Sequence, residues 1–332
     1  VLPKNNSNVV VINCPATPCA SRDRASGPGP ANGVIHDHEF GVHVDRVAAA
    51  IGVHSRKPGQ REVLEAAKLA QDAGFDAIEL CFGAGELSPD ASEASLAALK
   101  EGIEGMGFAI SSMATGFYWA KSLSSPDEAE RKEAVEFTKA YINAANVLEV
   151  DAILVVPGAV NVPFDPSRPV VPSKTVWDIS QRSLKELLPF AEKAGVAICV
   201  ENVWNKFLTG PFELAQYIDS FQSPFVKSYF DAGNVLLTGY PEHWIEILGG
   251  KRIGRVHVKN FTAHDGGGTL ADFTDSLMKG TLNWEAVFGA LKNAGYDGYV
   301  TPEMLVSDKG LPDPELARQV AKDMRKLLEQ YG

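Results

Sequence analysis

Residues 193–202 read KAGVAICVEN, and this stretch decides how the rest of the chain is interpreted. A helical segment ends at Gly195, because glycine readily adopts the left-handed conformation that ends many helices. The apolar run VAICV follows at once and shows no polar alternation, which is typical of a strand buried on both faces of a parallel sheet. The run ends in Glu201 and Asn202, so polar side chains stand where the strand stops.

The same unit recurs along the chain, with a helical pattern, a turn and then a short apolar run. Its other copies are DAGFDAIEL (72–80), GMGFAISSM (105–113), LEVDAILVV (148–156) and NAGYDGYVTPE (293–303). Apolar runs at 225–231 and 252–260 lack the glycine but keep the spacing, and a first strand is expected at 48–55. Eight strands alternating with amphipathic helices predict a single (β/α)8 TIM barrel over residues 46–332. An open doubly wound sheet is the alternative, but no GxGxxG sequence follows the first strand.

The first 45 residues differ from this pattern. They are rich in Asn, Pro, Gly, Ser and Arg and have no sustained period, so we expect an irregular N-terminal extension over residues 1–45. Cys14 and Cys19 lie in this stretch as CPATPC, a spacing that favours a local disulfide or free thiols over a zinc site.

Charge and hydropathy limit the partners of the chain. Its 332 residues carry a net charge of −11, which argues against nucleic acid as a partner. No run of about 18 apolar residues is present, so we expect no membrane-spanning helix. No secretory signal is recognisable at the start, and the expected location is the cytoplasm, with a removed leader left open.

Four consecutive strands end in, or carry, a potential metal ligand. In a (β/α)8 barrel the functional side chains gather at the C-terminal ends of the strands. Glu201, Asp231, His257 and Glu303 occupy these places in strands five to eight. Singly, each could be a salt-bridge partner, a helix cap or a core histidine, but several carboxylates at one barrel mouth would repel one another unless a cation joined them. Together they predict a site for one divalent ion, with Mn²⁺, Mg²⁺, Co²⁺ and Zn²⁺ all compatible.

Other polar and aromatic residues near the strand ends are candidates for substrate contact. Lys259 lies two residues after His257 and therefore on the same face of its strand, where it could hold a hydroxyl, a phosphate or an enolate oxygen. The remaining predicted substrate-binding residues are Asn202, Trp204, Asn205, Trp119 and His54. Glu79, near the end of the second strand, fits a substrate contact and a buried ion pair equally well.

Several long segments resemble a known family. They are ATGFYW (114–119), ILVVPGAV (153–160), VENVWNKFL (200–208), YFDAGNVLLTGYPEHWIEILG (229–249), VHVKNF (256–261) and GYDGYVTPEM (295–304). The chain resembles the sugar phosphate isomerase/epimerase family with the xylose isomerase-like TIM barrel, and within it proteins similar to L-ribulose- or L-xylulose-5-phosphate 3-epimerases and hexulose-6-phosphate isomerases.

The resemblance implies one divalent metal held by Glu201, Asp231, His257 and Glu303, with Glu201 and Glu303 also exchanging the substrate proton. Related ketose 3-epimerases often carry His three residues after the metal aspartate and Arg six residues after the metal histidine. Here these positions are Asn234 and Ala263, so the identity of the sugar is left open.

The resulting hypothesis is a metal-dependent isomerase or epimerase of a ketose or keto-sugar, phosphorylated or free. It would act by proton abstraction next to the carbonyl. Two alternatives are a lyase that completes a β-elimination, such as an inosose dehydratase-like enzyme or one cleaving a 3-keto-glycoside, and a non-catalytic sugar-binding barrel or subunit. A homo-oligomer is also expected to be possible.

Overall fold

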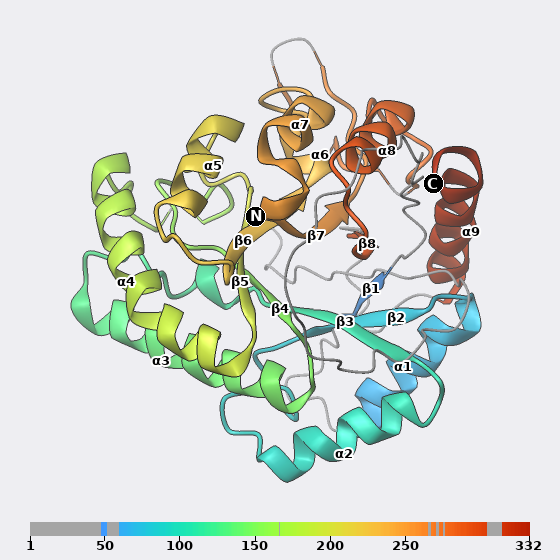
Figure 1. The fold of residues 1–332 in the computed structure, drawn as a ribbon, viewed down its shortest axis with the longest axis horizontal. Coiled ribbons are helices and arrows are strands. Elements are labelled where there is room, and N and C mark those ends of the chain that lie inside the picture. Colours follow the sequence, from blue (N-terminus) through green and yellow to red (C-terminus); the bar gives the residue numbers. More distant parts are fainter. Residues whose placement is uncertain are drawn as a thin grey trace, which may run out of the picture.

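The computed structural model describes residues 48–51, 60–165, 167–264, 267–269, 272–274, 276–303 and 314–332. Eight parallel strands are arranged in chain order, each hydrogen-bonded to the next, and the first also lies against the last (Figure 1). The predicted (β/α)8 barrel is therefore confirmed. The strands are β1 (Ala48–Ile51), β2 (Ala77–Cys81), β3 (Ala109–Ala114), β4 (Ala152–Val155), β5 (Ala197–Glu201), β6 (Val226–Asp231), β7 (Ile253–Val258) and β8 (Val300–Pro302).

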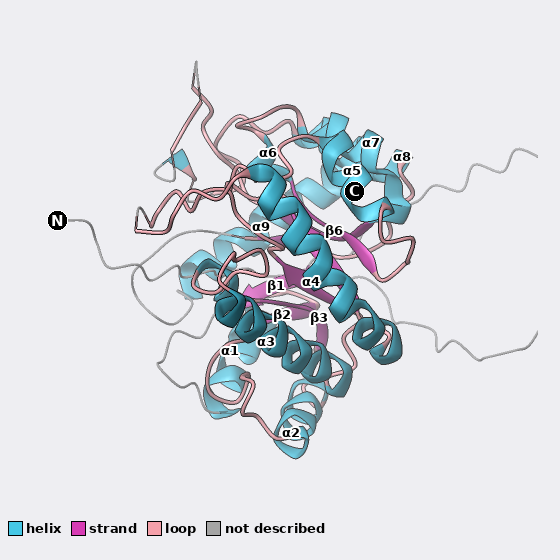
Figure 2. Cartoon of the chain, turned by 90° about the vertical axis from the view of Figure 1, so that its left-hand side faces the viewer, coloured by secondary structure: helices cyan, strands magenta, loops and turns pink. Residues whose placement is uncertain are grey.

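Helices surround the barrel and cover the outer faces of the strands (Figure 2). They present apolar side chains such as Leu184 and Leu187 of α4 inward, and both are fully buried. Side chains cap several of them, as Asp127 does at α3 by accepting hydrogen bonds from the backbone of Ala129 and Glu130. The helices are α1 (Gln60–Ala73), α2 (Glu93–Glu104), η1 (Phe117–Trp119, a 3₁₀ turn), α3 (Glu128–Val147), α4 (Ser173–Ala194), α5 (Pro211–Asp219), α6 (Ala232–Val235), α7 (Pro241–Arg252), α8 (Trp284–Asn293) and α9 (Pro314–Tyr331).

The turn from helix to strand has the predicted left-handed residue. Gly195 ends α4 with a φ of 71°, and its N–H donates to the carbonyls of Ala191 and Glu192. The copy of the unit at 148–156 has no glycine at this turn, and Glu149 adopts the left-handed conformation there with a φ of 56°. A side chain in this conformation is strained, so the geometry of the turn is imposed by the fold rather than by glycine alone.

Two predictions from the sequence fall partly outside the described residues. The first strand was expected over 48–55; the structure describes β1 over Ala48–Ile51, and residues 52–55, with His54, lie outside the described residues. The extension over residues 1–45, with Cys14 and Cys19, also lies outside them, so the division at residue 46 stays a prediction. No helix in the described part of the chain is long and apolar enough to cross a membrane.

An arginine of β7, largely but not fully buried, bonds across the barrel to the backbone of β3. Arg255, from the first half of β7, donates to the carbonyl of Ser111 at 2.8 and 3.0 Å, and it also pairs with Asp151 just before β4. Inward-facing side chains recur every second residue along a strand. His257 and Lys259 therefore follow Arg255 toward the opposite, C-terminal end of the barrel.

Candidate metal centre

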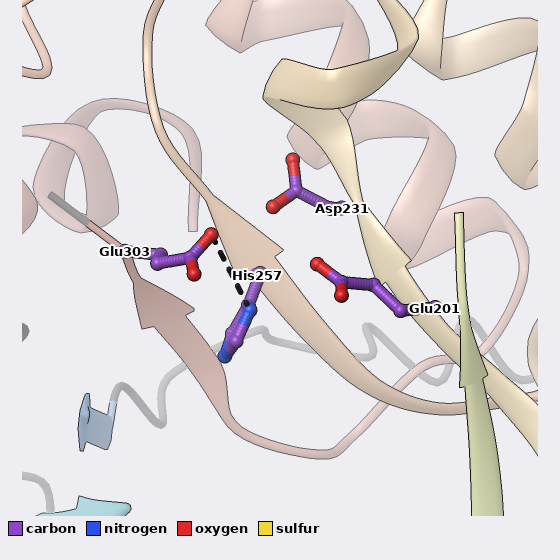
Figure 3. Close-up of side chains that lie close together, drawn as sticks. All are labelled: Glu201, Asp231, His257 and Glu303. Atoms are coloured by element: carbon purple, nitrogen blue, oxygen red, sulfur yellow. Dashed lines mark ion pairs between the residues drawn. The ribbon is translucent and has the colours of Figure 1, made fainter. Parts of the chain in front are cut away.

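Four side chains converge at the C-terminal end of β5 to β8. Glu201 and Asp231 are the last residues of β5 and β6, His257 lies on β7, and Glu303 directly follows β8. One ligand atom from each lies within 4.8 Å of all the others. Figure 3 shows Glu303 and Glu201 approaching from opposite sides, with Asp231 and His257 between them. The structure thus brings together the quartet that the strand-end pattern had predicted.

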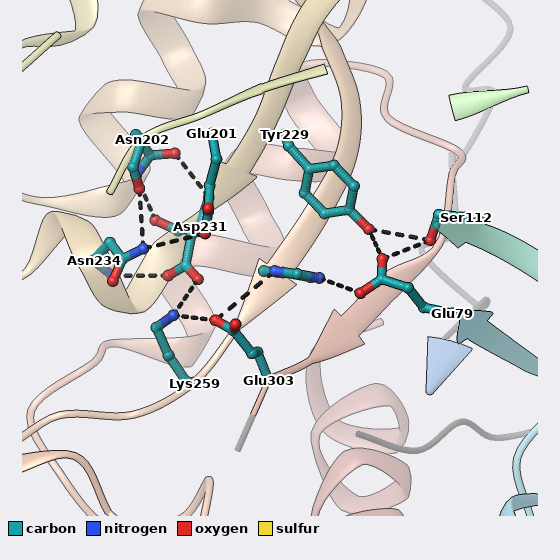
Figure 4. Close-up of polar contacts among 10 residues, drawn as sticks. Glu79, Ser112, Glu201, Asn202, Tyr229, Asp231, Asn234, Lys259 and Glu303 are labelled. Atoms are coloured by element: carbon teal, nitrogen blue, oxygen red, sulfur yellow. Dashed lines mark hydrogen bonds and ion pairs between the residues drawn. The ribbon is translucent and has the colours of Figure 1, made fainter. Parts of the chain in front are cut away.

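Asp231 is held by backbone and amide contacts. Its carboxylate caps the short helix α6 by accepting a hydrogen bond from the N–H of Asn234 at 2.7 Å. Asn202 fixes the backbone on both sides, because its amide donates to the Asp231 carbonyl and accepts from the Asp231 N–H, each at 2.8 Å. Asn234 completes the arrangement by donating to the Asn202 carbonyl at 3.0 Å (Figure 4). The position of Asp231 is therefore set by the ends of two neighbouring strands.

Lys259 neutralises part of the charge of the cluster. Its ammonium lies 2.7 Å from Asp231 Oδ2 and also pairs with Glu303 Oε2, and only 5% of the side chain is exposed. The ring of Phe273 covers it at 5.4 Å from the ring centre. Gly233 allows the approach, because a Cβ there would lie 2.7 Å from the carbonyl oxygen of Lys259.

His257 presents its two ring nitrogens to different surroundings. Nε2 lies 2.9 Å from Glu79 Oε1, deep in the barrel. Nδ1 points toward the cluster, 3.9 Å from Glu303 Oε2, and although buried it has no hydrogen-bond partner among the described residues. A buried nitrogen without a partner is costly unless it binds something. It is therefore the clearest sign that the cluster is built to hold a further group.

The two glutamates have opposite pKa shifts when no cation is present. Burial and, after it, the negative charge of Glu303 raise the pKa of Glu201 to about 8. Burial also acts on Glu303, but Lys259 and His257 together outweigh it and lower the pKa of that carboxyl. The pKa of Asp231 is raised, first by burial. Burial lowers the pKa of His257, but Glu79 together with Glu303 and Glu201 outweighs it and raises the pKa to about 9. The crowding of carboxyl groups therefore changes the proton affinity of every member of the quartet.

These residues fit a divalent cation. Three carboxylates and one imidazole form a mixed oxygen and nitrogen donor set that suits Mn²⁺, Mg²⁺, Co²⁺ or Zn²⁺. A cation would pair with the free lone pair of His257 and relieve the repulsion between carboxylates. We therefore treat the quartet as a candidate site for one divalent ion.

The other predicted contact residues have mixed outcomes. Trp204 lies near the cluster, where its indole donates to the Asn234 carbonyl at 3.0 Å and its ring packs against Phe273. Trp119 lies in η1, half-buried, with its ring edge-on to that of Phe164. Substrate contact by either tryptophan stays a prediction.

Two further predicted contacts, Asn202 and Asn205, form hydrogen bonds to the backbone, and substrate contact by either stays a prediction. The amide of Asn205 is buried and holds the loop after β5, donating to the Gly158 carbonyl at 2.8 Å and accepting from the Phe207 N–H at 2.9 Å. Both polar ends of this amide are bound to backbone, so Asn205 shapes the loop. Asn202 likewise serves the backbone of Asp231. Adjacent polar residues after a strand could not be sorted into these roles from the sequence alone.

Sequence reasoning missed the residues that support the quartet. Asn234 was noted only as a departure from a family pattern, and Phe273, Tyr229 and Ser112 were not singled out. Tyr229 and Ser112 both contact Glu79, which the sequence left undecided. The available signal was the polar residue inside an otherwise apolar strand, as in FVKSYFD and FAISSM, because such a group requires a buried partner.

Comparison with known proteins agrees with the fold. An uncharacterized protein of Methanocaldococcus jannaschii is 27% identical over 216 residues, which cover 62% of this chain and 67% of that protein. The structure of an L-ribulose 3-epimerase superposes with a TM-score of 0.69 at 20% identity, covering 86% of this chain and 95% of that one. The D-psicose 3-epimerase of Clostridium cellulolyticum H10 gives 0.63 at 21% identity, with coverage of 81% and 90%.

A 3-keto-D-glucoside 4-epimerase from E. coli shares the architecture as well. Its TM-score is 0.64 at 16% identity, and the match covers 84% of this chain and 97% of that one. The family model described as "Xylose isomerase-like TIM barrel" matches residues 67–328, which include all four residues of the quartet. The chain therefore belongs to the xylose isomerase-like TIM barrel family.

Proposed function

We propose that this protein is a divalent-metal-dependent isomerase or epimerase that acts on a ketose or keto-sugar. The observation that carries the proposal is the convergence of Glu201, Asp231, His257 and Glu303 within 4.8 Å at the C-terminal end of the barrel. In this fold that end holds the active site of essentially every characterised enzyme.

The two glutamates form the acid and base pair. They approach the centre of the cluster from opposite sides, so a sugar carbon between them is accessible to one carboxyl group on each face (Figure 3). Without a cation the pKa of Glu201 is raised and that of Glu303 is lowered, so the two carboxyl groups differ in proton affinity, as an acid and a base do. Glu303 removes the proton next to the carbonyl, Glu201 returns one, and the roles exchange in the reverse reaction.

The remaining residues bind and orient the sugar. A divalent ion in the quartet would polarise the carbonyl and stabilise the negative charge that develops on its oxygen. Lys259 offers a second positive group on the same side, buried beneath Phe273 and able to donate to a substrate oxygen. Trp204 packs against Phe273 and extends the apolar surface next to this ammonium.

The names of the structural relatives support the same reaction class. They include an L-ribulose 3-epimerase, D-psicose 3-epimerases and a 3-keto-D-glucoside 4-epimerase. All of these reactions invert a carbon directly next to a carbonyl, which proton removal and return accomplish without other co-reactants.

Solvent exchange tests the proposal directly. The Mn²⁺-loaded protein is incubated in D2O with free and phosphorylated ketoses, and products are followed by NMR and mass spectrometry. We expect deuterium at the carbon next to the carbonyl with the carbon skeleton retained. Glu201→Gln and Glu303→Gln should each abolish exchange, whereas Asp323→Asn, which removes a buried carboxylate of α9, should leave it intact.

Two results would contradict the assignment. A product that has lost water or an aglycone would identify a lyase, since β-elimination follows the same first proton transfer. Exchange that persists in both glutamine variants would show that Glu201 and Glu303 are not the acid and base.

A further inference from the structure

A buried polar chain lies directly behind the candidate metal centre. Glu79, in the middle of β2, has no exposed surface. Its Oε2 accepts hydrogen bonds from Ser112 Oγ at 2.7 Å and from the hydroxyl of Tyr229, while its Oε1 faces His257 Nε2 at 2.9 Å. The ring of Tyr229 also packs on the imidazole, with ring centres 4.4 Å apart. Figure 4 shows this chain running from Ser112 to the ligand cluster.

This geometry fixes which nitrogen of His257 can bind a cation. A neutral imidazole has one N–H and one lone pair. With Glu79 as the acceptor at Nε2, the proton belongs there, and the lone pair belongs to Nδ1. This nitrogen points into the cluster, 3.9 Å from Glu303 Oε2, and has no hydrogen-bond partner among the described residues. A carboxylate in this position also makes the imidazole a stronger ligand.

Glu79 is itself immobilised by strands rather than loops. Glu79, Ser112, Tyr229 and His257 lie on β2, β3, β6 and β7, and all four are buried. Each oxygen of the carboxylate has its own partners, so the carboxylate cannot rotate without breaking hydrogen bonds. A contact whose only task was to stabilise the fold would not need to leave Nδ1 unbound beside three carboxylates.

We propose that Glu79, held by Ser112 and Tyr229, is the positioning residue that sets the tautomer and orientation of His257 for metal binding. The proposal rests on the metal site proposed above. Glu79 does not touch the cation or the sugar and acts only through the imidazole.

Metal affinity and a spectroscopic signature test the proposal without relying on turnover. Purified full-length protein is titrated with Mn²⁺ by calorimetry and with Co²⁺ by visible absorption. Glu79→Gln keeps the volume and neutralises the charge, and we expect it to weaken Mn²⁺ binding about 10- to 100-fold, the usual effect of losing such a partner. The Co²⁺ absorption bands should shift, because the imidazole ligand changes in strength and orientation.

Asp323→Asn is the matched control. Asp323 is also buried and also accepts two side-chain hydrogen bonds, from Ser276 at 2.6 Å and Gln319 at 2.7 Å, but it lies on α9 and is not part of the quartet or of the chain behind it. Neutralising it should leave Mn²⁺ affinity and the Co²⁺ spectrum unchanged. A purely structural effect of losing a buried carboxylate would appear in both variants.

The outcomes separate this proposal from the one on which it rests. If Glu79→Gln binds Mn²⁺ as wild type does while His257→Ala loses binding, Glu79 is not a positioning residue and the metal site stands. If wild type binds no divalent ion, both proposals fall. Should Glu79→Gln not fold, Tyr229→Phe decides, because it removes only one hydroxyl donor to Glu79: a three- to tenfold loss of affinity supports the proposal, and unchanged affinity overturns it.

Discussion

Replacing Lys259 by methionine should destabilise the metal-free protein far more than the loss of an ordinary lysine. The ammonium lies 2.7 Å from Asp231 Oδ2, pairs also with Glu303, and has only 5% of its side chain exposed. Methionine fills nearly the same space but leaves these carboxylates without their nearest counter-charge.

The cost follows from the burial. Two unit charges about 4 Å apart attract by about 4 kcal/mol at an effective dielectric constant of about 20. Removing one partner of a buried pair typically costs about 3–5 kcal/mol. At about 2 °C per kcal/mol for a domain of this size, the melting temperature should fall by about 6–10 °C.

Thermal unfolding with and without Mn²⁺ measures the effect. Mn²⁺ should stabilise Lys259→Met more than it stabilises wild type, because the ion becomes the main counter-charge of the cluster. Lys100→Met is the matched control: this lysine also pairs with two carboxylates, Glu104 at 2.8 Å and Glu149 at 3.4 Å, but at the surface of the barrel. It should cost less than about 1 kcal/mol. Equal costs for the two variants would refute the idea that Lys259 compensates buried charge.

Three further predictions concern the raised pKa values, the strained turn at Glu149 and the hydrogen bonds between the Asn202 amide and the Asp231 backbone. The pKa values of Glu201 and His257 are raised to about 8 and about 9, so both groups bind protons more tightly in the folded state than in the unfolded state. Metal-free protein should therefore lose stability as pH rises from about 5 to 9, by up to ~1.4 kcal/mol per pH unit for each group. Denaturant unfolding in EDTA checks this, and a flat profile would contradict it. With saturating Mn²⁺ the loss should shrink or reverse, since metal ligands bind deprotonated. Glu149→Gly should raise the free energy of unfolding by about 1 kcal/mol by relieving a φ of 56°, and no gain would mean that the turn is unstrained. Asn202→Ala removes two hydrogen bonds to the Asp231 backbone, so it should lower the free energy of unfolding by about 2–3 kcal/mol and weaken Mn²⁺ binding. Full Mn²⁺ affinity in this variant would show that the metal site does not need these two hydrogen bonds.

The fold and the quartet were predictable because, in a parallel barrel, the position of a residue along its strand already tells at which end of the barrel it lies. Each strand from β2 to β8 starts shortly after a left-handed residue, and the strands end at the same rim, so the residue that follows an apolar run is already assigned to the rim. This rule placed Glu201 and Glu303 without any knowledge of their partners. The same rule did not predict the backbone hydrogen bonds of Asn202 and Asn205, since it locates the rim but does not indicate which side chains bond to the loops.

Contacts through the barrel interior were beyond this rule. Glu79 meets His257 across 178 residues, and Tyr229 across 150, which depends on how inward-facing side chains of β2, β6 and β7 meet across the barrel axis. Strand register adds to the difficulty, because β2 and β6 each shift register against the following strand. Such a shift moves side chains along the axis by an amount that local sequence does not encode.

Strand β7 and the residue after it place three polar side chains at successive depths in the barrel, and each has different partners. Arg255 and His257 of β7, and Lys259 one residue past its end, alternate along one face and lie successively nearer the C-terminal end of the barrel. Arg255 bonds to backbone carbonyls and to Asp151, whereas Lys259 contacts the carboxylates on which the proposed chemistry depends. His257 lies between them, with one nitrogen bound to Glu79 and the other free for a cation. The orientation of the proposed site is therefore set from inside the barrel, so that loops after the strands can vary in their sugar contacts without disturbing the position of the imidazole.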